Sequence, residues 1–96
     1  MLNSRQKKNL RAKAHDLKPI VLIGKAGVTT GCIQSIDEVI ESQELIKVKF
    51  LEHKDNKKTL SDEIAKKTDS EIIGSIGHTI MLFRQNPDKE KQKYKI

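Results

Sequence analysis

The sequence predicts an α/β fold in which helices pack on one sheet, in the order α-β-α-β-α-β-β. The chain has 96 residues, which is the size of one domain. Its Ile, Leu and Val residues form blocks whose spacing alternates between helical and strand periods. Strands that alternate with helices are typical of sheets with parallel pairs joined by crossover helices. We therefore predict one domain over residues 1–85, followed by a flexible basic tail over residues 86–96.

The composition excludes several classes of protein. No apolar run approaches the roughly 20 residues that a membrane-spanning helix needs, so we expect no membrane association. The first residues contain no apolar stretch that could form the core of a signal peptide. The single cysteine, Cys32, cannot form an internal disulfide. These features together predict a cytoplasmic protein.

The first element is predicted to be a helix over residues 4–16, with Ser4 as its N-cap. Leu10 and Ala14 fall on one face at helical spacing, and Pro19 ends the element. Basic side chains occupy or flank the opposite face: Arg5, Lys7, Lys8, Arg11 and Lys18.

Residues 20–23 form a continuous apolar run between Pro19 and Gly24, which predicts a strand buried on both faces. A glycine-rich turn follows, Gly24-Lys25-Ala26-Gly27, and Thr29 or Thr30 can cap the helix after it. The remaining predicted elements are a helix over 30–42, a strand over 45–51, a helix over 57–68, and a hairpin of strands over 71–76 and 79–84 that turns at Gly77-His78.

The positive charge is unevenly distributed. The chain carries a formal net charge of +6 with His neutral. Residues 1–25 hold seven basic residues against Asp16 alone, whereas residues 26–84 hold eight basic and ten acidic residues. A basic pole on a neutral or acidic body is typical of proteins that bind polyanions.

The Gly24–Gly27 loop lies between a predicted strand and a helix N-terminus. Glycines allow close approach of the backbone to a ligand, and the exposed N–H groups and helix dipole favour an anion. Lys25 adds a mobile point charge suited to phosphate. KH domains use a G-x-x-G loop to clamp a nucleic-acid backbone. The alternative is a tight strand-to-helix turn without a ligand; neither a Walker A string nor a dinucleotide fingerprint occurs.

Several stretches carry a resemblance to a known family. They are Arg5-Gln6-Lys7 followed by Leu10, the string AHDLKPIVLIGKAGVT over residues 14–29, and two later strings, ELIKVK over residues 44–49 and IGHTIMLFR over residues 76–84. The chain resembles the CRM domain family (chloroplast RNA splicing and ribosome maturation), in particular its stand-alone bacterial YhbY-like members. The resemblance implies a two-layer sandwich with a four-stranded mixed sheet whose last strand is antiparallel, similar to the C-terminal domain of bacterial translation initiation factor three.

The resemblance also implies a function. Family members bind RNA, and the bacterial ones are associated with precursors of the large ribosomal subunit. We expect a non-enzymatic protein that binds precursor rRNA in pre-ribosomal particles as a monomer, with the first helix and the loop forming one continuous phosphate-binding surface. His78 departs from the family pattern, because relatives often have Lys there. The predicted RNA-binding residues are Gly24, Lys25, Ala26, Gly27, Arg5, Lys7, Lys8, Arg11, Lys18 and Arg84.

No catalytic, metal or cofactor site is predicted. The three histidines lack the spacing of metal ligands, and Cys32 falls on the inward face of the second helix. Only three aromatic residues occur, so no platform for stacking bases is expected. The main alternative function is a protein–protein adaptor on the ribosome or translation machinery, which would use an acidic helix face of Asp37, Glu38, Glu41 and Glu44.

Overall fold

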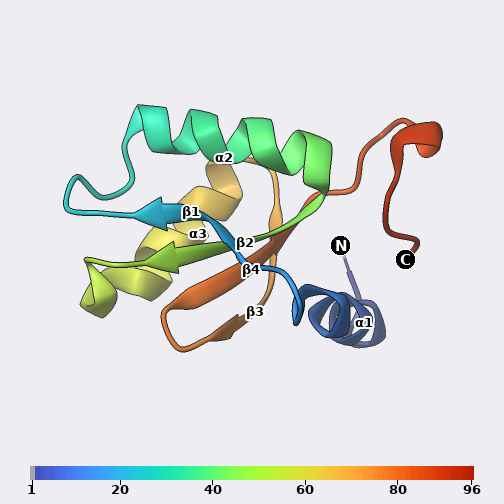
Figure 1. Cartoon of the computed structure of the whole chain (residues 1–96), viewed down its shortest axis with the longest axis horizontal. Helices are drawn as coiled ribbons and strands as arrows, with labels where there is room; N and C mark the ends of the chain where they lie inside the picture. Colours follow the sequence, from blue (N-terminus) through green and yellow to red (C-terminus); the bar gives the residue numbers. More distant parts are fainter. Residues whose placement is uncertain (1) are drawn as a thin grey trace.

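The computed structural model describes residues 2–96 and confirms the predicted order of helices and strands (Figure 1). Over this range the elements are α1 (Ser4–Ala14), β1 (Pro19–Ile23), α2 (Thr30–Gln43), β2 (Leu45–Phe50), α3 (Lys57–Lys67), β3 (Glu71–Ile76) and β4 (Thr79–Phe83). Two single turns of 3-10 helix, η1 (Lys54–Asn56) and η2 (Lys89–Lys91), complete the described chain.

The four strands form one mixed sheet in the order β1-β2-β4-β3. β1 pairs with β2 in parallel, whereas β4 is antiparallel to both of its neighbours, β2 and β3. The last strand therefore runs opposite to the other three, as the family resemblance implied. β1 and β3 are the edge strands.

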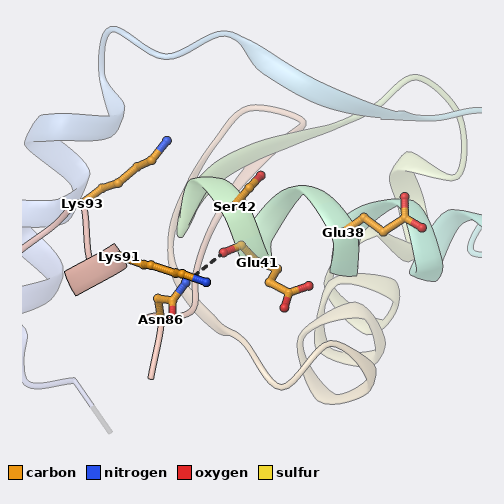
Figure 2. Close-up of a pocket in the computed structure, with 6 residues that line it drawn as sticks. All are labelled: Glu38, Glu41, Ser42, Asn86, Lys91 and Lys93. Carbon is orange, nitrogen blue, oxygen red and sulfur yellow. Dashed lines mark hydrogen bonds between the residues drawn. The ribbon is translucent and has the colours of Figure 1, made fainter. Parts of the chain in front are cut away.

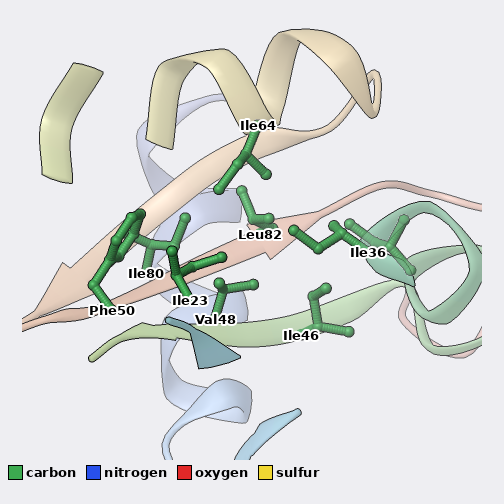
Figure 3. Close-up of a cluster of buried hydrophobic side chains, with 9 residues drawn as sticks. Ile23, Ile36, Ile46, Val48, Phe50, Ile64, Ile80 and Leu82 are labelled. Atoms are coloured by element: carbon green, nitrogen blue, oxygen red, sulfur yellow. The ribbon is translucent and has the colours of Figure 1, made fainter. Parts of the chain in front are cut away.

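Helices cover the two faces of the sheet unequally. α2 and α3 lie on one face, where their apolar side chains meet those of all four strands (Figure 3). This cluster includes Ile36 and Ile64 from the helices and Val48 and Leu82 from the central strands. α1 packs on the opposite face through Leu10 and Ala14. It covers only the end of that face where β2 and β3 begin, so the rest of the face has no helix over it (Figure 1).

The N-cap of α1 lies one residue before the predicted cap. Asn3, not Ser4, is the N-cap: its side chain accepts a hydrogen bond from the Gln6 N–H at 2.8 Å. The Gln6 side chain accepts one in return from the Asn3 N–H at 2.9 Å. The prediction of Ser4 was wrong because only Asn3 has a Gln at the position that completes this reciprocal capping box.

β1 is not buried on both faces as its sequence predicted. Val21 and Ile23 pack into the core, but Ile20 is 49% and Leu22 56% exposed. The reason is that β1 lies at the sheet edge and α1 does not extend over it. A continuous apolar run does not distinguish an edge strand with one open face from a central strand.

Arg11 fixes α1 to the sheet. Its guanidinium donates a hydrogen bond to the Ile73 carbonyl at 2.8 Å, and its side chain lies over Gly74. A Cβ at Gly74 would lie 2.6 Å from the Arg11 Cδ, so a larger residue at this point of β3 would displace the Arg11 side chain. At the other end of α1, the Lys47 ammonium donates to the carbonyls of His15 and Leu17.

The segment after β4 is packed against the domain, whereas the sequence predicted a flexible tail. The buried Glu44 carboxylate accepts hydrogen bonds from the backbone N–H groups of Asn86, Lys93 and Tyr94. The Tyr94 ring lies edge-on to Phe83, with ring centroids 6.3 Å apart. Glu44 therefore does not belong to the solvent-facing acidic helix surface that was predicted.

We expect Glu44→Ala to release residues 86–96 and to lower the free energy of unfolding by about 2 kcal/mol. The reason is that hydrogen bonds to a buried charged group are each worth about 1.5–3 kcal/mol, part of which water recovers when the segment detaches. Urea unfolding measures the loss, and amide hydrogen exchange at Tyr94 reports the release. Glu41→Ala, at an exposed position on the same helix, is the control. Unchanged protection at Tyr94 in Glu44→Ala would contradict the role of this carboxylate.

Candidate nucleic-acid interface

The Gly24–Gly27 loop forms a tight turn at the end of β1. The Gly27 N–H donates to the Gly24 carbonyl at 3.0 Å, and Gly27 has a φ of +73°, which favours glycine. A Cβ added at Gly24 would have no heavy atom within 4 Å. The fold itself therefore leaves open space at Gly24, and Lys25 and Ala26 project at an exposed tip.

His53, which lies between the end of β2 and η1, holds this loop. Its Nε2 lies 2.8 Å from the Lys25 carbonyl oxygen, and a carbonyl can only accept, so Nε2 carries the donated proton. The ring also lies against Gly27, 3.4 Å from the place of a Cβ there. The sequence analysis rejected His53 as a metal ligand and did not predict that it would hold the loop. The available signal was topological, because segments that follow two parallel strands meet at the same end of a sheet.

The loop leads into the N-terminus of α2. Thr29 is the N-cap, since its hydroxyl accepts from the Cys32 N–H at 3.0 Å. The first turn of α2 contains no acidic side chain. The dipole of the helix N-terminus is therefore not offset by a local carboxylate, which favours an anion beside the loop.

Cys32 packs against the core, as its place on the inward face predicted. Burial raises the pKa of its thiol, and a hydrogen bond with the backbone of Thr29 opposes this rise only in part. A raised pKa keeps the thiol protonated at neutral pH, so Cys32 does not add a negative charge beside the loop.

The predicted basic residues divide into engaged and free side chains. Lys7 forms an ion pair with Glu71 at 3.4 Å, and Arg11 is bound to the Ile73 carbonyl. Arg84 donates to the Asp37 carboxylate at 2.6 Å and to the Thr68 carbonyl at 2.7 Å. The structure thus gives these three a role in packing. Four exposed members of the predicted set, Arg5, Lys8, Lys18 and Lys25, form no side-chain hydrogen bond or ion pair within residues 2–96, whereas Arg11 is exposed but engaged.

α1 and the loop do not touch, contrary to the expectation of one continuous surface. They lie at opposite ends of β1 (Figure 1). A strand of five residues separates its first and last Cα atoms by about 13 Å at about 3.3 Å per residue. The free cations of α1 and the loop therefore form two separate sites, with the uncovered face of the sheet between them.

The final hairpin lies at the same end of the sheet as the loop. The Phe50 N–H donates to the His78 carbonyl, while Lys57 donates to the Gly77 carbonyl. Gly77 has a φ of +58°, which agrees with the tight turn predicted here. The His78 side chain is exposed and faces the solvent.

The acidic surface predicted on α2 is smaller in the structure. Asp37 is paired with Arg84, and Glu44 is buried. Glu38 and Glu41 remain exposed and line a pocket of about 520 Å³ together with Ser42, Asn86, Lys91 and Lys93 (Figure 2). The two carboxylates therefore share this pocket with two lysines of the C-terminal segment, which reduces the negative potential that a basic partner would meet.

Among residues 2–96, no group of three or more His, Cys, Asp or Glu side chains is arranged to hold a metal ion. Within the same range, none of the helices combines the length and apolar character required to span a membrane.

Comparison with known proteins identifies the family. Residues 2–84 match the model of the CRS1/YhbY (CRM) domain. "Probable RNA-binding protein YqeI" of Bacillus subtilis (strain 168) is 37% identical over 92 residues, which cover 95% of this chain and 96% of that protein. "Probable RNA-binding protein PA4753" of Pseudomonas aeruginosa is 33% identical over 91 residues, covering 94% and 88% of the two chains.

A solved structure agrees with these matches. The solution structure of the hypothetical protein SAV1595 from Staphylococcus aureus superimposes with a TM-score of 0.82 and is 37% identical, covering 97% of this chain and 98% of that one. Its agreement extends over the sheet and all three helices, since so little of either chain is left out. On the match of nearly the whole chain to one family model and on these relatives, this chain belongs to the CRS1/YhbY (CRM) domain family.

Proposed function

We propose that this protein is a non-enzymatic RNA-binding protein that acts in assembly of the large ribosomal subunit by binding precursor rRNA. The observation that carries the proposal is the geometry of the Gly24–Gly27 loop. His53 holds the loop, the space next to the Gly24 backbone is open, and the Lys25 side chain is exposed. Several relatives in the family are named as RNA-binding proteins.

The loop is suited to a phosphate for three physical reasons. Gly24 leaves room for a ligand to approach the backbone. The N-terminus of α2 contributes the positive end of its dipole without an opposing carboxylate. The His53 hydrogen bond to the Lys25 carbonyl keeps the loop in one conformation before binding, which lowers the entropic cost of ordering it.

The exposed cations of α1 supply the second contact. Arg5 and Lys8 project from the helix, and Lys18 lies between α1 and β1. An RNA that engages them and the loop together must present phosphates across the length of β1. We therefore infer that the protein recognises RNA by the spacing of its backbone rather than by reading base sequence.

Cross-linking in cells, followed by sequencing of the bound RNA, tests this function. We expect the cross-links to concentrate in one region of large-subunit precursor rRNA. Cross-links spread over many transcripts would reject the assembly role and leave a general RNA-binding protein. Robust co-purification of a ribosomal protein without any cross-linked RNA would favour the adaptor function instead.

We expect Gly24→Asp to weaken RNA binding at least tenfold without a large change in thermal stability. The new side chain enters open space, but its carboxylate repels phosphate at the loop. Gly27 is a poorer choice, because its positive φ and its contact with His53 would distort the turn. Gly24→Ala separates steric from electrostatic effects, and Thr59→Asp adds the same charge on the exposed side of α3. Full RNA affinity in folded Gly24→Asp would remove the loop from the interface.

We expect His53→Asn to lower RNA affinity by about two- to tenfold, the equivalent of one lost hydrogen bond of about 0.5–1.5 kcal/mol. His53 has a φ of +60°, which Asn tolerates, but the shorter side chain does not reach the Lys25 carbonyl. His78→Asn is the matched control in the exposed hairpin. Amide exchange at Ala26 and Gly27 should rise only in His53→Asn, and equal effects of the two substitutions would argue against the specific role of His53.

We expect RNA affinity to fall with salt at a log–log slope of about −3 to −4. Four free cations that each displace one counterion give this value at about 0.7–0.9 per phosphate contact. Fluorescence anisotropy over a range of potassium chloride concentrations measures the slope. A slope near zero with saturable binding would refute recognition through phosphates.

A further inference from the structure

The uncovered part of the sheet presents a row of four side chains, with an aliphatic residue at each end, between the two phosphate sites. The strand register places Leu22 beside Lys49, Lys49 beside Thr79, and Thr79 beside Ile76. These four side chains cross the whole sheet on the face opposite α2 and α3. Leu22 is 56% and Ile76 63% exposed, the two highest values among the large hydrophobic residues of the described chain. We call these four residues the open row.

A shallow depression adjoins the open row on the side of α1. It has a volume of about 170 Å³ and is lined by Pro19, Lys47, Ile76, Thr79 and Met81. Ile20, which is 49% exposed, follows Pro19 of this recess at the irregular point of the β1–β2 register. The uncovered face thus combines the exposed Leu22 and Ile76 with a recess, and the exposed Ile20 adjoins it.

The two ends of this face are bounded by the sites described above. Arg11 lies over Gly74 where α1 crosses the sheet, and the Gly24–Gly27 loop follows the end of β1. An RNA strand that contacts both α1 and the loop by the direct route must therefore cross the open row.

Charge indicates which partner this face accommodates. The open row and the recess contain lysines but no carboxylate. The Lys47 ammonium is used by the carbonyls of His15 and Leu17, whereas the ion pairs within residues 2–96 do not include Lys49. Lys49 is thus a free cation that lies between Leu22 and Thr79. A second copy of the chain, with the same net charge of +6, would meet repulsion there.

We propose that unpaired nucleotides of the bound RNA lie on this face, with bases against Ile20, Leu22 and Ile76 and a phosphate at Lys49. The proposal rests on the RNA-binding function proposed above and specifies the class of RNA. In a duplex the bases are stacked inside and the backbone faces outward, so aliphatic side chains would meet charged phosphates. Unpaired bases expose their apolar faces, and contact with those side chains removes both surfaces from water.

Binding of two probe RNAs to a double variant tests the proposal. The probes are a hairpin with a long single-stranded loop and a fully paired duplex of the same number of nucleotides. We expect Leu22→Thr/Ile76→Thr to weaken binding of the hairpin about tenfold at an unchanged salt slope, and to leave duplex binding unchanged. Thr suits an exposed strand position, and both side chains lie outside the core. Ile96→Thr removes a comparably exposed aliphatic side chain at the C-terminus as the control.

A second variant tests the phosphate contact independently. We expect Lys49→Met to reduce the magnitude of the salt slope for the hairpin by about 0.7–0.9, the value for one phosphate contact. Unchanged hairpin affinity in the double variant, or equal losses for hairpin and duplex, would overturn the proposal. Loss of a protein partner with RNA affinity intact would assign the face to protein binding and would also overturn it.

The two proposals fail in distinguishable ways. If the wild-type protein binds neither probe, the RNA-binding function itself is wrong. If it binds both and Gly24→Asp abolishes binding while the double variant does not weaken it, only the role of the open row is wrong.

Discussion

The parallel pairing of β1 with β2 is the constraint on which the functional surface depends. Because the two strands run in the same direction, the segments that follow them emerge at one end of the sheet. This geometry brings His53 to the Gly24–Gly27 loop and allows the bond from its ring to the Lys25 carbonyl. The same pairing leaves β1 at the edge, with α1 at its beginning and the loop at its end. An antiparallel arrangement would have placed His53 and the loop at opposite ends.

The charged side chains fall into two groups with different roles. One group holds the fold: Arg11 anchors α1, Arg84 joins β4 to α2 and to the end of α3, and Glu44 binds the C-terminal segment. Each of these meets backbone groups that packing would otherwise leave without partners, and such buried contacts are costly to break. The other group, such as Lys25 and Lys49, has no such contact and stays available for an anion. A count of basic residues overstates the binding surface because it merges the two groups.

The sequence was a good guide wherever local spacing determines structure. The boundaries of the helices and strands, the hairpin at Gly77 and the Thr29 cap all follow from periodicity and turn chemistry. Its guidance failed where a residue meets a distant part of the chain. Arg84 meets Asp37 across 47 positions, and Glu44 meets Lys93 across 49. No local pattern contains these pairs, so residue spacing could not show that Arg84 is engaged within the fold or that Glu44 is buried.

The prediction that β1 is buried on both faces failed for the same reason, because local spacing does not show which elements lie over a strand. The run from Ile20 to Ile23 contains more apolar surface than an edge strand needs for its core-facing side. Its two inward residues pack into the core, which leaves Ile20 and Leu22 exposed within this chain. Exposed aliphatic side chains of this kind are tolerated singly, but a row that joins two cationic sites points to a ligand with both apolar and anionic parts. Single-stranded RNA has that composition at every nucleotide. The edge position of β1 is therefore the feature that couples the fold to the proposed binding. β1 separates the loop from α1, and its edge position exposes the apolar side chains between them.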